Sequence, residues 1–405
     1  MKKLTALITD DARFREASRK YLKLYAMRKC ILAIAAVLIT ISATAQNAVT
    51  VVDADRAPVV GASVISANGL ILGFTDAAGA IKASERDYPL SVRCLGYEAA
   101  TVAAPCDTVY MQDATFSLPE MVVSTAGRPI TRVVTYARGY FTASIGNDTV
   151  RAFGEYMLEY FFADGKVKGY KKSDSQSSCK ASRLFLSLPQ TEDGDSLMQS
   201  GATLMFYLIT CPIELPHERI EETEAIRGGA ATDTVPGKYG PEFIYRKNER
   251  IYSVEKDELA NYKNHSRGHW LLKLLGFNMI FKLVNTSDIY AVNDSGKYDL
   301  YDYIYGSQTA QVIGKGKVIK WFFRKNMDVD FYGYNEQYPV SIERLTVEDY
   351  KEMRANRKTR KEEFRVPDNV LPLAPAIQVL AERKDLEVSL SDVKGMDESD
   401  EAGDE

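Results

Sequence analysis

Several patterns that catalysis commonly requires are scarce or missing in this sequence. The chain has 405 residues but only three histidines, His217, His265 and His269. It contains no Gly-x-Ser-x-Gly motif around a serine nucleophile and no Gly-x-x-x-x-Gly-Lys motif for phosphate. The sequence therefore gives no support for a serine hydrolase or for nucleotide binding through such a loop.

An excess of charge of one sign is also lacking. Fifty-one Lys and Arg residues face 55 Asp and Glu residues, which gives a net charge of -4. Proteins that bind nucleic acids usually concentrate basic residues, because these displace counterions from phosphate groups. The balance therefore indicates a globular protein of mixed surface charge that does not bind nucleic acid.

The N-terminal region has no apolar run long enough to span a membrane. Residues 31–41 are apolar except for Thr40, whereas a hydrocarbon core of about 30 Å needs roughly 20 apolar residues. Arg28 and Lys29 precede this run and Ala43-Thr44-Ala45 follows it, which is the pattern of a secretory signal peptide. We predict a signal peptide over residues 1–45, cleavage between Ala45 and Gln46, and a true translation start at Met27.

Short apolar runs and turn signals alternate from residue 48 to residue 123. The ordered segments are Val51-Val52-Asp53, Pro58-Val59-Val60-Gly61-Ala62-Ser63-Val64, Thr75-Asp76-Ala77-Ala78-Gly79, Leu95-Gly96-Tyr97 and Leu118-Pro119-Glu120-Met121-Val122-Val123. Reversals at such short intervals leave no room for helices and are typical of a β-sandwich. About seven strands fit before Leu118, with tight turns at Asn68-Gly69 and Asp76–Gly79.

These five segments resemble the carboxypeptidase regulatory-like domain, a transthyretin-like sandwich, with Val59 and Met121 in place of the family's usual Leu and Val. The resemblance covers residues 48–123 only. It implies an N-terminal module of exported and outer-membrane proteins in Gram-negative bacteria of the Bacteroidota type. In such proteins the module serves anchoring or contact instead of catalysis.

The family name does not bring a zinc peptidase site with it. Such a site needs a His-x-x-Glu pair and a further histidine, and none of the three histidines begins that pair. His265 and His269 are spaced four apart, as two metal ligands on one helical face would be, but Gly268 weakens a helix and spacing indicates no third ligand. We therefore predict no metal and no cofactor, and keep a metal-dependent hydrolase of peptide or glycan near His265 and His269 as an alternative.

Four cysteines remain after the predicted leader, namely Cys94, Cys106, Cys179 and Cys211. Four cysteines in an oxidising compartment permit three pairings. We expect Cys94 to pair with Cys106, because both lie in the sandwich, on a strand and in the turn region after it. Four unpaired cysteines buried as small apolar residues are the alternative.

The region after the sandwich is rich in Tyr, Phe, Val and Ile and predicts a larger antiparallel sheet or half-barrel. We assign a sandwich domain to residues 46–124, this β-rich domain to residues 125–366 and a flexible acidic tail to residues 367–405. The expected strands are Arg132–Thr142, Asp148–Ala163, Lys166–Lys171, Arg183–Leu188, Thr203–Ile209, Phe243–Tyr252, Asp288–Val292, Tyr298–Tyr305, Thr309–Ile313, Val318–Phe323 and Met327–Tyr334.

Two helical segments are expected in this domain. The apolar residues at 270–277 are too dense for one helical face, and Gly268 and Gly276 break the segment, so residues 258–280 predict a short buried helix or an inserted hairpin that covers the sheet. Thr346-Val347-Glu348-Asp349 has the pattern of a helix start, and we expect that helix to run to Phe364. Its basic residues suit anionic headgroups, but the interspersed glutamates favour a solvated helical face.

Taken together, the sequence predicts an all-β exported protein of the periplasm or outer membrane. The expected function is a non-catalytic binding or scaffold role, with an envelope protein or outer-membrane component as partner, a glycan or peptide as ligand, and at most peripheral membrane contact. A small outer-membrane β-barrel is the second alternative, although the Tyr-rich run at residues 298–305 alternates only in part.

Overall fold

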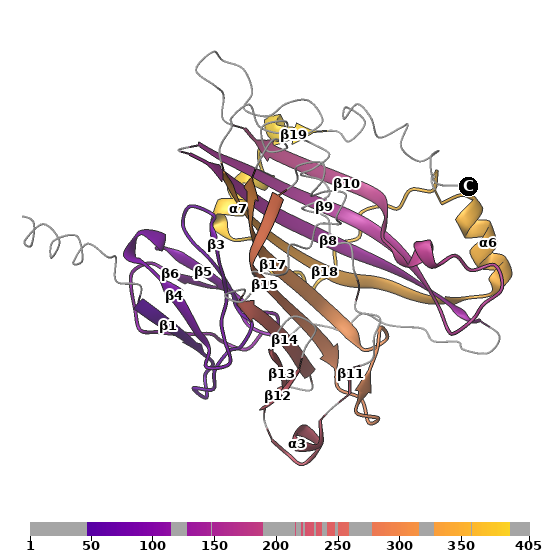
Figure 1. Cartoon of the computed structure of the whole chain (residues 1–405), viewed down its shortest axis with the longest axis horizontal. Coiled ribbons are helices and arrows are strands. Elements are labelled where there is room, and N and C mark those ends of the chain that lie inside the picture. Colours follow the sequence, from indigo (N-terminus) through magenta and orange to yellow (C-terminus); the bar gives the residue numbers. More distant parts are fainter. Residues whose placement is uncertain are drawn as a thin grey trace, which may run out of the picture. The chain divides into compact units, whose positions relative to one another are not determined.

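The computed structural model of the chain describes residues 47–114, 128–146, 148–188, 215, 220–221, 223–230, 232–236, 241–247, 250–258, 278–315, 328–357 and 359–388. These residues form mainly β-strands with few helices (Figure 1). The predicted all-β class is therefore confirmed. Among the described residues, no helix is both long and apolar enough to cross a membrane.

The N-terminal part is a sandwich of seven strands. One sheet has the order β4-β1-β7 and the other the order β3-β2-β5-β6. The strands are β1 (Asn47–Val52), β2 (Ser63–Ile65), β3 (Ile71–Phe74), β4 (Ala80–Ala83), β5 (Leu90–Arg93), β6 (Ala100–Val102) and β7 (Thr108–Tyr110). The seven expected strands are present, but β1 and β7 pair in parallel, so the sandwich is not antiparallel throughout. The last segment of the family resemblance, residues 118–123, lies outside the described residues.

The predicted turn at Asp76 has the expected hydrogen bonds. Asp76 Oδ1 accepts from the backbone N–H of Ala78 and of Ala80, both at 2.9 Å. Gly79 adopts a φ of +71°, and a Cβ there would lie 2.4 Å from the carbonyl oxygen of Val51. Only glycine fits this turn, because any side chain would collide with the backbone of the neighbouring strand.

The second part is an antiparallel sheet of ten strands in the order β12-β13-β14-β15-β17-β18-β8-β9-β10-β19. Its strands are β8 (Ile130–Ile145), β9 (Asp148–Ala163), β10 (Ser178–Ser187), β12 (Thr232–Pro236), β13 (Pro241–Lys247), β14 (Arg250–Glu258), β15 (Asn278–Ala291), β17 (Tyr303–Lys315), β18 (Val329–Leu345) and β19 (Glu387–Val388). The predicted strand at residues 148–163 has the bounds of β9.

Other strand predictions need correction. The expected single strand at residues 243–252 is a hairpin of β13 and β14. Residues 166–171 form a turn that leads to the 3-10 helix η2 (Lys172–Ser175), not a strand. Residues 309–313 belong to the long strand β17. Most of the helix or hairpin expected at residues 258–280 lies outside the described residues, and its last three residues begin β15.

The remaining elements are short. They are the paired strands β11 (Ile220–Glu221) and β16 (Lys297–Tyr298), the helices α3 (Glu224–Arg227), α6 (Val347–Ala355) and α7 (Pro375–Ala381), and the 3-10 helices η1 (Glu85–Asp87) and η4 (Lys384–Leu386). Helix α6 begins as predicted, since Thr346 Oγ1 accepts from Asp349 N at 3.1 Å. It ends at Ala355 and not at Phe364, because the chain then runs along β10, where Glu362 N donates to Lys180 O at 3.4 Å.

The C-terminal segment corrects the prediction of a flexible tail from residue 367. Leu371, Ala374, Ile377 and Leu380 are buried. The last three pack with Ile65, Ile71 and Phe74 of the sandwich and with residues of β8, β9, β10 and β18. The acidic run at residues 397–405 lies outside the described residues.

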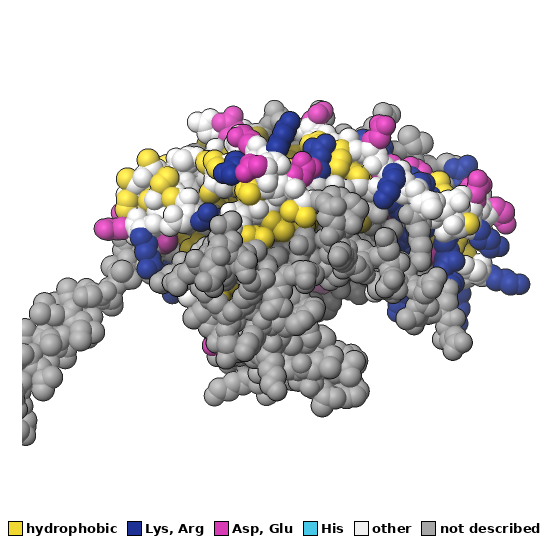
Figure 2. Space-filling model, turned by 90° about the horizontal axis from the view of Figure 1, so that it is seen from above, with side chains coloured by type: hydrophobic (Ala, Val, Ile, Leu, Met, Phe, Trp, Pro, Cys, Tyr) yellow, Lys and Arg dark blue, Asp and Glu magenta, His cyan; other side chains and the backbone are white. Residues whose placement is uncertain are grey.

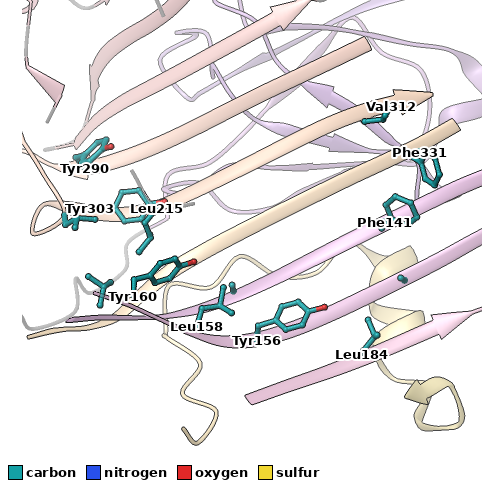
Figure 3. Close-up of a cluster of buried hydrophobic side chains, with 14 of the residues drawn as sticks. Phe141, Tyr156, Leu158, Tyr160, Leu184, Leu215, Tyr290, Tyr303, Val312 and Phe331 are labelled. Carbon is teal, nitrogen blue, oxygen red and sulfur yellow. The ribbon is translucent and has the colours of Figure 1, made fainter. Parts of the chain in front are cut away.

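The two faces of the sheet differ in what they carry. One face, here called the apolar face, bears Phe141, Tyr156, Leu158, Leu184 and Phe331, which belong to one large buried cluster (Figure 3). The opposite face, here called the sandwich face, bears Tyr136, Tyr140, Phe153, Tyr334 and Tyr338 and packs against residues 59–95 and the C-terminal segment. Strand β8 is buried along nearly its whole length, because both faces of the sheet are covered there.

One leucine and one valine of α7 test whether the C-terminal segment is docked. We expect Leu380→Ala to lower the free energy of unfolding by about 2–5 kcal/mol, the cost of emptying a packed apolar site. Val379 on the same helix is 64% exposed, so Val379→Ala should change it by less than about 0.5 kcal/mol. Urea denaturation measures both, and equal effects would mean that α7 is not packed on the sheet.

Candidate functional site at the junction of sandwich and sheet

A buried carboxylate joins the sandwich to the sheet. Arg93 is the last residue of β5, and its Nη2 lies 3.2 Å from Glu336 Oε1 and 3.3 Å from Glu336 Oε2. Glu336 lies on β18, and both side chains are only 1% exposed. The backbone at Arg93 is itself fixed, since its carbonyl oxygen accepts from Ser63 Oγ at 3.1 Å.

A second arginine completes this cluster from within the sheet. Arg138 on β8 lies directly opposite Glu336 in the strand register. Its Nε donates to Glu336 Oε1, and its Nη2 donates to the carbonyl oxygen of Leu371. One carboxylate thus connects the sandwich and the sheet, and its arginine partner extends the connection to the C-terminal segment.

Tyrosine hydroxyls surround the same carboxylate. Tyr334 and Tyr305 donate to Glu336 Oε2 at 2.7 Å and 3.3 Å. The Arg93 guanidinium lies 5.6 Å from the centroid of the Tyr334 ring, a cation–π distance. Tyr338 OH accepts from Leu371 N at 3.1 Å. The burial of Glu336 is therefore compensated by several donors at once.

The electrostatics of the cluster hold each group in one protonation state. Burial raises the pKa of Glu336, but Arg138 and Arg93 outweigh burial and lower that pKa to about 2. Burial, with the neighbouring carboxylate, raises the pKa values of Tyr334 and Tyr305. None of these groups changes charge near neutral pH, where a general acid or base has to exchange a proton. The cluster is suited to holding elements together, not to proton transfer.

The cluster carries an excess of positive charge. Two guanidiniums face one carboxylate, and the buried Nε and Nη1 of Arg93 have no hydrogen-bond partner among the residues that the structure describes. Unpaired buried donors cost about 1–3 kcal/mol each and more when charged. The junction is therefore a costly arrangement that depends on Glu336.

A second contact between the sandwich and the sheet involves residues of the segments that carry the family resemblance. Asp53, buried after β1, forms an ion pair with Lys247 at the end of β13. The Lys247 ammonium lies 4.7 Å from the centroid of the Tyr97 ring, and Tyr245 OH donates to Val60 O at 2.8 Å. Burial raises the pKa of Asp53, but the bond from Lys247 and two backbone N–H groups lower it overall.

Gly96 allows the sheet to approach the sandwich at this contact. Its φ is +92°, and a Cβ there would lie 2.6 Å from Arg250 Nη1 and 3.1 Å from Tyr252 OH. A side chain would therefore meet both the strain of positive φ and two side chains of β14. Residues that carried the family resemblance, including Asp53, Gly96 and Tyr97, thus face the chain's own sheet.

A second buried carboxylate lies elsewhere on the sandwich face. Glu159 on β9 accepts from Arg132 Nε at 2.7 Å and is also paired with Arg360 and, at 3.4 Å, with Lys180. Arg132 extends this network to Glu362 and Glu343. The network binds the segment that follows α6 to the strands β8, β9 and β10.

The predicted disulfide is not present. Cys94 and Cys106 are both free cysteines, as is Cys179, while Cys211 lies outside the described residues. Cys94 is buried in the sandwich core and Cys106 packs at the edge of the same cluster, so both serve as small apolar side chains. Burial raises the pKa of Cys94 to about 12, which keeps its thiol protonated and unreactive.

The other predicted site residues fall outside the described part of the chain. This holds for Ala45 and Gln46 at the predicted cleavage site and for His217, His265 and His269. Within the residues that are described, no group of three or more His, Cys, Asp or Glu side chains is arranged to hold a metal ion. Many described tyrosines are core residues, such as Tyr245 and Tyr252, whose ring centroids lie 4.5 Å apart.

Sequence reasoning missed Arg93, Arg138 and Glu336, although a signal was present. Each is a charged residue inside a strand rich in apolar or aromatic residues, at a position whose neighbours two residues away are buried. A charge at such a position needs a partner of opposite sign inside the fold. The two positive residues and one negative residue were therefore candidates for one buried cluster, but their pairing depends on the strand register.

Comparisons with known proteins give no identification. No family model and no curated protein sequence matches the chain. Among solved structures, the chain is similar to one described as lipid-protein interactions in lipovitellin, with a TM-score of 0.28 and 10% sequence identity. The similarity covers 55% of this chain and 26% of that chain, so the chain spans about a quarter of that protein. This likeness carries no argument about function.

Replacement of Glu336 tests the junction. Glu336→Gln keeps the shape but leaves Arg93 and Arg138 without a counter-charge, so we expect the free energy of unfolding to fall by about 3–5 kcal/mol. The triple change Arg93→Met, Arg138→Met and Glu336→Leu removes all three charges and should recover most of this loss. Chemical denaturation compares them, with the exposed Glu348→Gln as control. A loss below about 1 kcal/mol for Glu336→Gln would contradict the ionic junction.

The acid stability of the protein should depend on the same residue. The pKa of Glu336 is lowered in the folded protein from an ordinary value of 4.5 to about 2. Its contribution to stability is therefore complete above about pH 4.5 and is lost as the pH falls towards about 2. We expect the unfolding free energy of the natural chain to fall more steeply over this range than that of the triple variant. Parallel slopes in the two titrations would exclude this role.

Proposed function

We propose that this chain is an exported, non-catalytic protein of the Gram-negative cell envelope that acts by binding a partner or as a scaffold. The observation that carries the proposal is the buried attachment of the sandwich to the ten-stranded sheet through Arg93, Glu336 and Arg138. A module held in this way cannot swing freely, so the sandwich and the sheet present their surfaces as one body. Fixed relative positions are what a scaffold requires.

The use of the motif residues supports a scaffold role. A sandwich that resembles the carboxypeptidase regulatory-like domain is expected to anchor or contact other proteins. Here Asp53, Gly96 and Tyr97 face β13 and β14 of the same chain. Contact with an envelope protein or outer-membrane component then uses surfaces other than this motif face, and a glycan or peptide remains the proposed ligand class.

The protonation states of the described buried groups support the non-catalytic part of the proposal. The pKa of Glu336 is about 2 and that of Cys94 is about 12. Burial, together with the carboxylate of Glu336, raises the pKa values of Tyr305 and Tyr334 at the junction. These groups stabilise the fold in a single charge state, whereas catalytic acids and bases need pKa values near the working pH.

Export is tested by expressing the chain in a Gram-negative host and fractionating the cells. We expect the protein in the periplasmic or outer-membrane fraction, with a mature N-terminus at Gln46 by mass spectrometry. The double change Ala43→Leu and Ala45→Leu should block cleavage, because signal peptidase reads small residues at these positions. Expression from Met27 alone should give the same mature product, and an uncleaved protein in the cytosol would refute the proposal.

The non-catalytic part is tested on the same purified protein by measuring its metal content. We expect no stoichiometric metal. Zinc that co-purifies at one ion per chain, and that is lost when His265 and His269 are changed to Ala, would contradict the binding role and favour a metal-dependent hydrolase.

A further inference from the structure

Two stretches rich in Lys or Arg lie far apart in the sequence. Residues 165–172, in the turn after β9, contain four lysines and no acidic residue. Residues 350–361, from α6 and the chain after it, contain six Lys or Arg residues and one Glu. The whole chain has a net charge of -4, so these two stretches concentrate positive charge against the general balance.

The fold places these stretches against each other. The backbone N–H of Lys171 donates to Tyr350 OH at 3.1 Å, and the rings of Tyr170 and Tyr350 lie 5.8 Å apart. A Cβ at Gly169 would lie 3.2 Å from Lys351 Cε, so the lysine stem of α6 runs directly over the turn. The two stretches form one surface, here called the basic surface, which consists of Lys166, Lys168, Lys172, Lys351 and Arg354.

The nearest buried carboxylate cannot neutralise this surface. Asp174 accepts from Tyr350 OH at 2.6 Å, Arg354 Nε at 2.9 Å and Arg357 Nη1 at 2.8 Å. One negative charge therefore faces two guanidiniums, and a positive charge is left over before any lysine is counted. Within the described residues, no ion pair involves the four lysines of the basic surface, all of which are exposed.

Arginines and lysines of these two stretches differ in what they contact. Arg354, Arg357 and Arg360 bind the carboxylates of Asp174 and Glu159, with their flat guanidiniums in fixed geometry. The lysines are left pointing outward as mobile point charges on flexible stems. In Figure 2, Lys and Arg side chains gather at the right of the face shown, on the side where α6 is drawn in Figure 1.

We propose that the basic surface binds the anionic headgroups of a membrane leaflet. This partner rests on the proposed function, because it requires an exported protein that meets the envelope. Exposed lysines attract a fluid layer of phosphate groups without needing a fixed geometry, whereas recognition of one defined anion would use the forked arginines. The contact is peripheral and electrostatic, so it weakens as salt screens it.

Vesicle co-sedimentation of the purified full chain tests this proposal. The probes are vesicles of phosphatidylglycerol with phosphatidylethanolamine, and vesicles of phosphatidylcholine alone as the neutral control. We expect binding to the anionic vesicles only, with release at about 0.5 M salt, where the Debye length is only a few ångströms. Each basic residue near an anionic leaflet contributes about fivefold to partitioning. The variant Lys166→Gln, Lys168→Gln, Lys172→Gln and Lys351→Gln should therefore bind at least about a hundredfold more weakly.

A matched variant removes four exposed positive charges elsewhere, with Lys82, Arg86, Arg227 and Lys384 changed to Gln. Its net charge equals that of the first variant, so it should keep most of the binding if location matters. Thermal unfolding of both variants checks that they remain folded. Equal losses in both variants, or binding to neutral vesicles, would overturn the proposal.

Two further outcomes also overturn the assignment to a membrane. If neither vesicle type binds the natural chain, the basic surface has no lipid partner. The second outcome is that the natural chain binds a soluble polyanion such as heparin but not anionic vesicles, and that the four lysine changes abolish heparin binding. The partner is then a soluble polyanion and not a membrane. Cell fractionation reports separately on export, so failure of the vesicle assay leaves the proposed envelope role standing and identifies the lipid contact as the error.

Discussion

The arrangement of this protein depends on one carboxylate, that of Glu336, held between two arginines that belong to different parts of the chain. Arg138 comes from the neighbouring strand of the sheet and Arg93 from the sandwich. Moving charges out of water costs several kcal/mol per ion, and only close pairing with further hydrogen bonds offsets this cost. The junction meets that condition for Glu336, which also accepts from Tyr334 and Tyr305.

Such a cluster adds less to stability than to the choice of one arrangement. A wholly apolar contact between the sandwich and the sheet would tolerate small rotations and shifts, because dispersion and burial have no direction. The Arg93 contact requires both partners in position, because Arg93 without Glu336 is a buried charge without its counter-charge, and Glu336 without Arg93 loses one of its two arginines. Arg93 Nε and Nη1 lack a hydrogen-bond partner within the described part of the chain, so this orientation is kept even at some energetic cost. The apolar clusters around it supply the stabilisation that the charges do not.

Local chemistry predicted much of the fold. The seven strands of the sandwich, the Asp76 turn, strand β9 and the capped start of α6 follow from turn residues, alternation and a capping box that lie close together in sequence. Predictions were wrong where contacts with residues distant in the sequence determine where an element ends or whether a segment is packed. Helix α6 ends early because the chain pairs with the edge of β10, and residues 367–388 are packed because the sandwich and the sheet offer an apolar surface.

The site was harder to predict than the fold for the same reason. Arg93, Arg138 and Glu336 are spread over more than half of the sequence, and only the register of β18 against β8 brings two of them together. The basic surface likewise depends on a turn after β9 that meets a helix after β18. A sequence shows that a charge in a strand needs a partner, but it does not show which partner the topology supplies.

The two ionic clusters on the sandwich face have a common origin in β8. Arg132 and Arg138 lie six residues apart on this strand, which places them about 20 Å apart on one face. Arg138 meets its carboxylate on β18 and Arg132 meets Glu159 on β9, so each cluster is complete only when β8 is paired with that neighbour. The sandwich binds at the first cluster through Arg93, and the segment after α6 binds at the second through Arg360. Strand pairing around β8 therefore creates both docking sites, because each site needs a carboxylate that a neighbouring strand supplies.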